Sequence, residues 1–144
     1  MKLEKICVML DENAVMPTRA HDEDAGLDLY AKLGDSKIIY GKGSAVFDTG
    51  VHVLIPKGYA GLLVSKSGLN VKNGITSTGL IDSGYVGSIC VKLDNHSDRS
   101  FFVYGGQKIS QLVLIPVETP QLVVVDELPE TERGSGGFGS TGAF

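Results

Sequence analysis

The chain has 144 residues, enough for one domain of ordinary size, and 42% of them are hydrophobic. Its formal net charge of −4 argues against direct nucleic-acid binding and against an anionic membrane as the main partner. The apolar runs are too short to span a bilayer, and the charged N-terminal stretch MKLEKICVML does not resemble a signal peptide, so we expect a soluble, cytoplasmic protein.

Short apolar runs separated by turn residues dominate the chain, whereas helical patterns are weak because the chain contains 19 Gly and 5 Pro. Runs of this kind, rich in Val, Ile and Leu, predict strands. The expected strands are 5–10, 45–50, 51–56, 60–65, 88–95, 101–106, 111–117 and 121–128. One short helix fits residues 67–74. The pattern indicates an all-β barrel or a jelly-roll-like sandwich.

The chain has two cysteines, Cys7 and Cys90, and each lies in apolar surroundings. Their number and spacing match neither a disulfide framework nor a metal-binding motif. We expect both to be buried, reduced thiols.

The composition changes after residue 125. The acidic stretch DELPETER is followed by the Gly-rich RGSGGFGSTGAF, so we divide the chain into a β core (1–125) and a linker with a C-terminal arm (126–144). Convergent backbone N–H groups, the Arg133 guanidinium and the Ser140 and Thr141 hydroxyls suit an anion, and the ring of Phe138 suits stacking. A Gly/Ser-rich tail without a function is the alternative.

Four segments of the core carry side chains suited to a phosphorylated ligand. In GLIDSGYVG, Asp82 can orient and deprotonate a water molecule, and Tyr85 has an uncrowded ring. The stretch VSKSGLN combines Lys66 with a hydroxyl and a Gly, and GGQKISQL contains Lys108 and Gln111. Asp28 in DAGLDLYA suits a hydrated Mg²⁺. Taken singly, none is specific: the Asp82 segment is also typical of an Asp-initiated turn and Asp28 of a strand edge, and the two lysine segments are more typical of a polar loop and of solvent-facing polar residues.

As an ordered set, AGLDLYA, SKSGLN, GLIDSGYVG, GQKISQL and RGSGGFGSTG resemble the five motifs of the trimeric dUTP pyrophosphatase (dUTPase) family, over residues 25 to 142. The resemblance implies a distorted jelly-roll β-barrel with a flexible Gly-rich C-terminal arm, assembled as a homotrimer. It implies hydrolysis of dUTP to dUMP and diphosphate by water attack on the α-phosphorus, with Mg²⁺. Such a reaction limits uracil incorporation into DNA and supplies dUMP for thymidylate synthesis.

The resemblance also implies roles for individual residues. Asp82 matches the catalytic carboxylate, Tyr85 the ring under the deoxyribose, and Asp28 the residue that reaches the metal through water. The hairpin of residues 75–90 would read uracil with its backbone, and the arm would close over a site of another subunit. The substrate-binding residues implied are Lys66, Ser67, Gly68, Gly79, Ile81, Tyr85, Lys108, Gln111, Arg133, Phe138, Gly139, Ser140 and Thr141.

Three departures from the family pattern occur, at four positions. Lys66 replaces an Arg, Gln107-Lys108 replaces Asp-Arg, and Asn70 replaces an Ala. Lysine keeps the positive charge but lacks the planar fork of arginine, so the phosphate contacts are expected to differ.

Three other functions compete with this interpretation. A dCTP deaminase shares the fold, but Lys92 stands where its Glu is expected. A nucleotide-binding regulator with a protein partner stays open. An RNA-binding tail is disfavoured by the net charge and by the single Arg of the arm.

Overall fold

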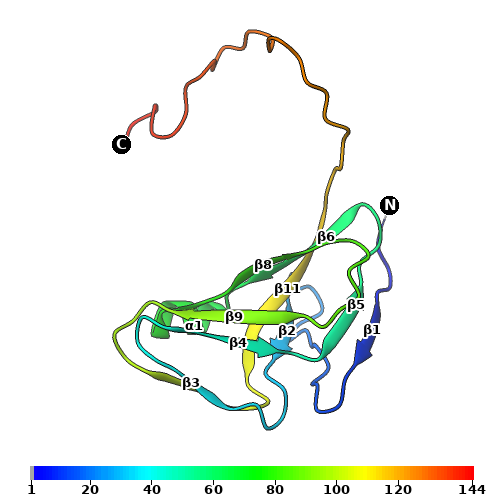
Figure 1. The fold of residues 1–144 in the computed structure, drawn as a ribbon, viewed down its shortest axis with the longest axis vertical. Helices are drawn as coiled ribbons and strands as arrows, with labels where there is room; N and C mark the ends of the chain where they lie inside the picture. Colours follow the sequence, from blue (N-terminus) through cyan, green and yellow to red (C-terminus); the bar gives the residue numbers. More distant parts are fainter. Residues whose placement is uncertain (1) are drawn as a thin grey trace.

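The computed structural model describes residues 2–144, and it is nearly all β (Figure 1). No helix among these residues is long and apolar enough to cross a membrane. The elements are β1 (Cys7–Leu10), β2 (Leu27–Tyr30), β3 (Lys37–Ile39), β4 (Ser44–Asp48), β5 (Val51–Leu54), β6 (Tyr59–Val64), α1 (Ser67–Asn73), β7 (Ile75–Thr76), β8 (Thr78–Ile81), β9 (Cys90–Asn95), β10 (Phe101–Val103) and β11 (Lys108–Pro116).

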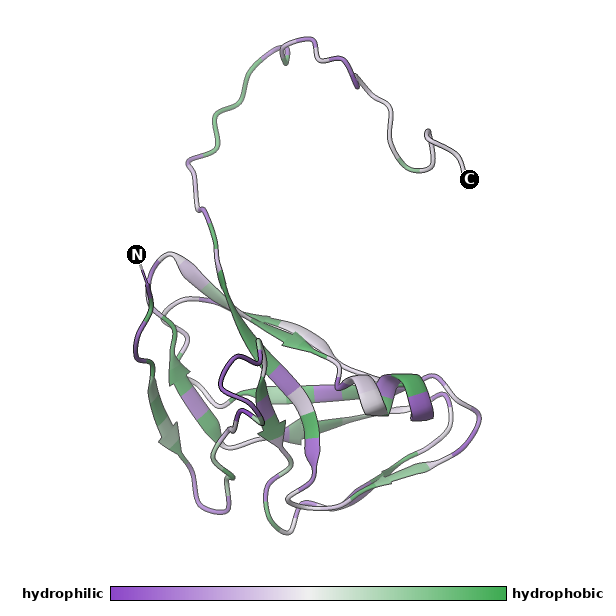
Figure 2. Ribbon diagram, turned by 180° about the vertical axis from the view of Figure 1, so that it is seen from behind, coloured by the Kyte–Doolittle hydropathy of each residue, from purple (hydrophilic) through white to green (hydrophobic). Residues whose placement is uncertain are grey.

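The strands form four antiparallel groups around one core. The largest sheet has the order β2-β11-β6-β8, and a second sheet has the order β4-β9-β7. The pairs β1–β5 and β3–β10 complete the barrel. Figure 2 shows the apolar residues alternating with polar ones along these strands, as expected for strands with one buried face.

The core is made almost entirely of branched aliphatic side chains. Its largest fully buried members are Phe47, Leu29, Ile39, Ile55, Ile75, Ile89, Leu93, Ile109, Leu112, Val51, Val91 and Val103. The few buried polar groups are hydrogen-bonded: the hydroxyl of Thr49 donates to the carbonyl of Ile89 at 2.7 Å. No buried side-chain nitrogen or oxygen in residues 2–144 lacks a partner. The site therefore rests on a rigid, fully paired framework.

Most of the expected elements are confirmed. Strands occur within seven of the eight expected segments, and the expected helix is α1, which ends at Gly74 in the left-handed conformation. The alternating sequence of β9 is the clearest case, because Val91 and Leu93 are buried while Lys92 is exposed.

The expected strand at 121–128 is wrong. Regular structure ends with β11 at Pro116, and residues 117–144 form neither strand nor helix. The apolar residues Leu122, Val123 and Val124 are exposed, Val124 to 98%. A segment becomes a strand only where a neighbouring strand pairs with its backbone, and within this chain β2 and β6 already flank β11.

The expectation that both cysteines are buried is also wrong. Cys7 and Cys90 are free and exposed. Each lies one residue before an inward-facing valine, Val8 or Val91, so the alternation of the strand turns the thiol to the outer face.

Beyond β11 the chain leaves the barrel and extends away from it (Figure 1). The amide of Val117 still donates to the carbonyl of Gly58 at 2.9 Å. Farther along, tight turns connect Thr131 with Gly134 and Gly137 with Ser140. Residues 126–144 thus carry local turns, and nearly all of them are exposed.

Candidate active site

A cluster of charged side chains forms where β2, β11 and the start of α1 meet. Asp28 on β2 pairs in register with Gln111 on β11. Its carboxylate is almost completely buried and bonds Lys66 Nζ through Oδ1 and Lys108 Nζ, at 3.2 Å, through Oδ2. Residues from three predicted motifs are therefore joined by one carboxylate.

The electrostatics of this cluster follow from its geometry. Burial alone raises the pKa of Asp28, but the hydrogen bonds and charges of Lys66 and Lys108 outweigh it and hold the pKa below its usual value. In return, the hydrogen bond to Asp28 raises the pKa of Lys108. Two ammonium groups share one carboxylate, so the cluster keeps a net positive charge that suits a phosphate.

Gln111 is held in place by its neighbours. Its side-chain amide donates to the carbonyl of Ser65 at 3.0 Å. A Cβ atom at Gly26 would overlap the side-chain oxygen of Gln111, so residue 26 must be Gly for this arrangement. Gly26 was not among the predicted site residues, although it lies in the first motif.

Lys66 occupies the N-cap position of α1 but makes no side-chain capping bond. Its side chain turns to Asp28 instead. Ser67 and Gly68 form the exposed first turn, and a Cβ at Gly68 would meet nothing within 4 Å. Packing within this chain therefore does not require Gly at 68. Asn70 is exposed on the same helix.

A second group of predicted residues lies on the hairpin after β8. β8 is the edge strand of its sheet, so backbone groups of alternate residues along Gly79–Ile81 face away from β6. Asp82 follows it directly and is exposed. A pocket of about 240 Å³ opens here, lined by Leu80, Ile81, Asp82, Tyr85, Ser88 and Cys90.

The turn after Asp82 fixes the ring of Tyr85. The amide of Tyr85 donates to the carbonyl of Asp82 at 3.2 Å, and its hydroxyl donates to the carbonyl of Ser88 at 3.0 Å. The ring crosses Gly87 so closely that a Cβ there would overlap it. Gly84 adopts φ 81°, in the left-handed region that favours Gly. Gly84 and Gly87 are therefore required by the turn itself.

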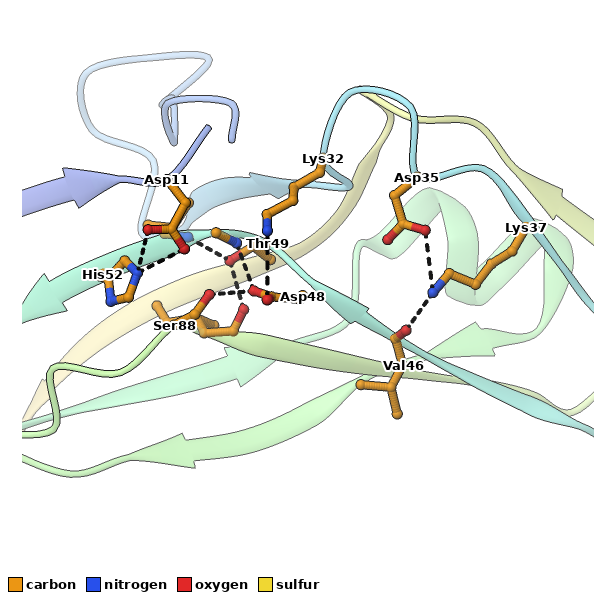
Figure 3. A network of polar contacts seen from close by, with 12 residues as sticks. Asp11, Lys32, Asp35, Lys37, Val46, Asp48, Thr49, His52 and Ser88 are labelled. Carbon is orange, nitrogen blue, oxygen red and sulfur yellow. Dashed lines mark hydrogen bonds and ion pairs between the residues drawn. The ribbon is translucent and has the colours of Figure 1, made fainter. Parts of the chain in front are cut away.

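Behind this turn lies a polar network that the sequence did not reveal (Figure 3). Asp48 at the end of β4 accepts hydrogen bonds from the Ser88 hydroxyl and, at 2.9 Å, from the amide of Gly50. These bonds lower the pKa of Asp48. Burial, with the negative charge of Asp48, raises the pKa of the Cys90 thiol.

The same network includes His52 on β5. Its Nδ1 lies 2.7 Å from the carbonyl oxygen of Val86, and its Nε2 lies 3.0 Å from both carboxylate oxygens of Asp11. The bond to Val86 and the bond to Asp11 raise the pKa of His52. No motif contains His52 or Asp11, so only the strand pairing of β1 with β5 reveals their proximity.

Within one chain the two groups of site residues lie at different points along β6. Thr78 pairs with Val64, two residues before Lys66, whereas Ile81, which precedes Asp82, pairs with Gly61 in the middle of the strand. The two pairs are three residue steps apart, a distance of about 10 Å along the sheet. The chain therefore brings Asp28, Lys66, Lys108 and Gln111 together, but not with Asp82 and Tyr85.

The predicted residues of the arm lie apart from both groups (Figure 1). Arg133 Nε donates to the carbonyl of Gly136 at 2.6 Å, within its own turn. Phe138 and the neighbouring Gly139, Ser140 and Thr141 are exposed.

Metal binding at Asp28 is limited by its partners. Both carboxylate oxygens already bond ammonium groups, and residues 2–144 contain no cluster of three His, Cys, Asp or Glu side chains that would hold an ion. Asp28 therefore fits a cation only at a distance, through water.

A larger hollow, of about 600 Å³, is lined in part by Lys72 and Arg99 and contains none of the predicted site residues.

Comparison with known proteins shows the family of this chain. Residues 12–142 match the family model for dUTPase. A deoxyuridine 5'-triphosphate nucleotidohydrolase of Clostridium tetani is 41% identical over 137 residues, 93% of each chain. One of Arabidopsis thaliana is 43% identical over 134 residues, which span 92% of this chain and 80% of the plant protein.

Solved structures give the same result. The Staphylococcus bacteriophage 80alpha dUTPase G164S mutant with dUpNHpp superposes with a TM-score of 0.90 at 33% identity, covering 98% of this chain and all of the phage chain. A D95N mutant dUTPase from phage phi11, described with a structural Mg(II) ion, has a TM-score of 0.80 at 31% identity, covering 88% of this chain and all of that one.

Proposed function

Because this chain belongs to the dUTPase family, we propose that it is a dUTP nucleotidohydrolase that converts dUTP and water to dUMP and diphosphate. The observation that carries the proposal is the match over residues 12–142, which includes both groups of site residues and most of the arm. This activity limits uracil incorporation into DNA and supplies dUMP for thymidylate synthesis.

In the proposed mechanism Asp82 acts on the attacking water. Its carboxylate accepts a hydrogen bond from the water and directs an oxygen lone pair at the α-phosphorus. The new P–O bond forms as the bond to the bridging oxygen breaks, diphosphate leaves, and Asp82 takes up the proton. The exposed position of Asp82 at the rim of the hairpin pocket supports this role.

Selection of base and sugar is assigned to the same hairpin. The outward backbone groups of Gly79 and Ile81 bind the uracil edge, and cytosine presents the opposite donor pattern. Tyr85 packs under the deoxyribose and leaves no room for a 2′-hydroxyl. The bonds that hold its ring across Gly87 support a rigid wall at this position.

The triphosphate is assigned to the charged cluster. Lys66 and Lys108 neutralise phosphate oxygens, and the first turn of α1, Ser67 and Gly68, approaches them closely, with Gln111 beside it. Mg²⁺ bound to the phosphates would add positive charge at the bridging oxygens, and Asp28 would contact it through water. The open space around Gly68 supports such an approach.

The separation of the two groups along β6 supports an assembly of three identical chains. One subunit would contribute the hairpin, a second the charged cluster, and a third the arm with Arg133 and Phe138. The exposed run of Leu122, Val123 and Val124 supports an exchange of this segment between subunits, because contiguous apolar surface of this kind marks an interface.

One further role is favoured by a specific relative. Phage dUTPases that superpose on this chain with a TM-score of 0.90 are described as controlling the transfer of virulence genes. A regulatory partner for this chain, like its cytoplasmic location and its lack of direct nucleic-acid binding, stays a prediction.

Lys92, which pairs with Asp94 at 3.3 Å on the outer face of β9, argues against deaminase chemistry.

The test is the release of diphosphate from dUTP, dCTP, dTTP and UTP in parallel, with Mg²⁺ present. We expect release from dUTP alone. Binding of dUTP without release would leave a nucleotide-sensing protein, and ammonia from dCTP would restore the deaminase.

A further inference from the structure

The turn that carries Asp82 and Tyr85 is anchored from behind by side chains outside the five motifs. His52 reaches the carbonyl of Val86 at 2.7 Å, and Asp48 accepts the hydroxyl of Ser88. The amide of Gly84 adds a backbone bond to Ile55 at 3.2 Å. These bonds join residues 84–88 to β4 and β5, so the framework behind the turn sets the positions of its outward side chains.

The two contacts of the His52 ring define its charge. Nδ1 faces a carbonyl oxygen and Nε2 faces a carboxylate, and both of these groups only accept hydrogen bonds. A neutral imidazole has one N–H and therefore satisfies one of them, leaving a lone pair against the other oxygen. Only the imidazolium donates to Val86 and Asp11 at once.

We propose that His52, as an imidazolium held by Asp11, is a positioning residue that fixes the Asp82–Ser88 turn for dUTP, and that its deprotonation releases the turn. The proposal rests on the function proposed above. The protonation state of the His52 ring would then determine the positions of Asp82 and Tyr85 relative to the nucleotide.

The charged groups around His52 favour the protonated form. Asp11 follows β1, and Asp48, which is paired with Lys32 at 3.6 Å, ends β4. The Cys7 thiol on β1 lies along the same pocket lining as His52. The hydrogen bond to the carbonyl of Val86 raises the pKa of His52 most, and both carboxylates raise it further.

The sign of the pH effect follows. A histidine has a pKa of about 6.5 in an unfolded chain. Because the folded value lies above that, the anchoring is complete below about pH 6.5 and is lost as the pH rises through the raised pKa of His52.

The test compares the pH dependence of kcat/KM for dUTP in the wild type, His52→Ala, Asp11→Asn and the control His21→Ala. His21 is an exposed histidine whose ring pairs with Asp24 in the loop before β2. The ratio of wild-type to variant values at each pH removes the titration of dUTP itself. We expect His52→Ala to lower kcat/KM about 10-fold at low pH, which corresponds to the loss of one charge-assisted hydrogen bond. At high pH the decrease should be smaller.

Asp11→Asn distinguishes positioning from a general loss of structure. Removing the carboxylate lowers the pKa of His52, so the decline of kcat/KM should move to lower pH, a shift that simple destabilisation does not produce. His21→Ala should follow the wild type throughout. A constant wild-type to His52→Ala ratio across the pH range would overturn the proposal.

A second readout does not depend on turnover. The ring of His52, followed by NMR in the free enzyme, should titrate above the ordinary histidine value and at lower pH in Asp11→Asn. Titration at or below the ordinary value would refute the imidazolium assignment even if dUTP hydrolysis is normal. Absence of dUTP hydrolysis with a raised His52 pKa would instead refute the proposed function.

Discussion

The glycines of the barrel and those of the arm are there for different reasons. At Gly26 and Gly87 an added Cβ would collide with the side chains of Gln111 and Tyr85. At Gly139 nothing lies within 4 Å, and the requirement is a backbone φ of 94°. Gly26 and Gly87 are therefore needed by contacts already made in the barrel, whereas no contact of this chain explains Gly139 except its own turn.

This difference indicates a division of labour between the two regions. The barrel builds the carboxylates, cations and backbone edges in advance, which keeps the reorganisation needed during reaction small. In the proposed function the arm would contribute after binding, by closing over the ligand and excluding water.

The largest expected effect is in the barrel. Asp82→Asn keeps the shape of the side chain but removes the base, so kcat should fall by about 10²- to 10⁴-fold. Binding of dUpNHpp, measured by calorimetry, should persist. Asp98→Asn, at an exposed aspartate paired with Lys42, is the control and should retain activity. Equal turnover in Asp82→Asn would remove the mechanism.

Next is the arm. Deletion of residues 133–144 should lower kcat/KM about 10²-fold, comparable to the loss of one preorganised donor. The melting temperature and the oligomeric state should not change, because the last strand of the barrel ends at Pro116 and the apolar run at 122–125 remains. Calorimetry and light scattering would measure both. A truncated enzyme with full activity would show that closure is dispensable.

A smaller effect concerns the stability of the barrel. Asp28→Asn removes the carboxylate between Lys66 and Lys108 and should cost about 1–2 kcal/mol of unfolding free energy at pH 7, reduced because both lysines are partly exposed.

The pKa of Asp28 is lowered in the folded state, so its contribution is present above about pH 4 and is lost as the pH falls through the lowered value. Urea denaturation at several pH values would measure this dependence. A difference between wild type and Asp28→Asn that stays constant down to acid pH would contradict it.

The smallest effect is spectroscopic. Phe138→Trp should change its emission when dUpNHpp binds, because a fully exposed ring becomes stacked on a base. Phe144→Trp places the same probe six residues farther along the arm, at another fully exposed ring, and should respond less. An identical response from both probes would argue against stacking by residue 138.

Much of the barrel was predictable because its strands bury alternate residues, as β9 does with Val91 and Leu93. The same alternation, applied strictly, would have placed Cys7 and Cys90 outside. The strand expected at 121–128 failed because apolar composition does not supply a pairing partner. The hydrophobic pattern alone thus predicts which segments are suited to form strands better than it predicts which strands pair with each other.

The site was predictable only in part. The motifs located Asp28, Lys66 and Lys108, but they did not show that the carboxylate of Asp28 joins the two lysines. The pairing of His52 with Asp11 spans 41 positions and depends on strand register, which a single sequence does not specify.

In the proposed trimer, the exposed run at Leu122, Val123 and Val124 would link the activity of this chain to its concentration. If that run is covered only by another subunit, dilution uncovers it and separates the hairpin from the charged cluster at the same time. Mass action then governs turnover as well as stability. Specific activity would fall at low enzyme concentration because the subunits dissociate. The substrate dUTP would oppose that loss by binding the assembled form.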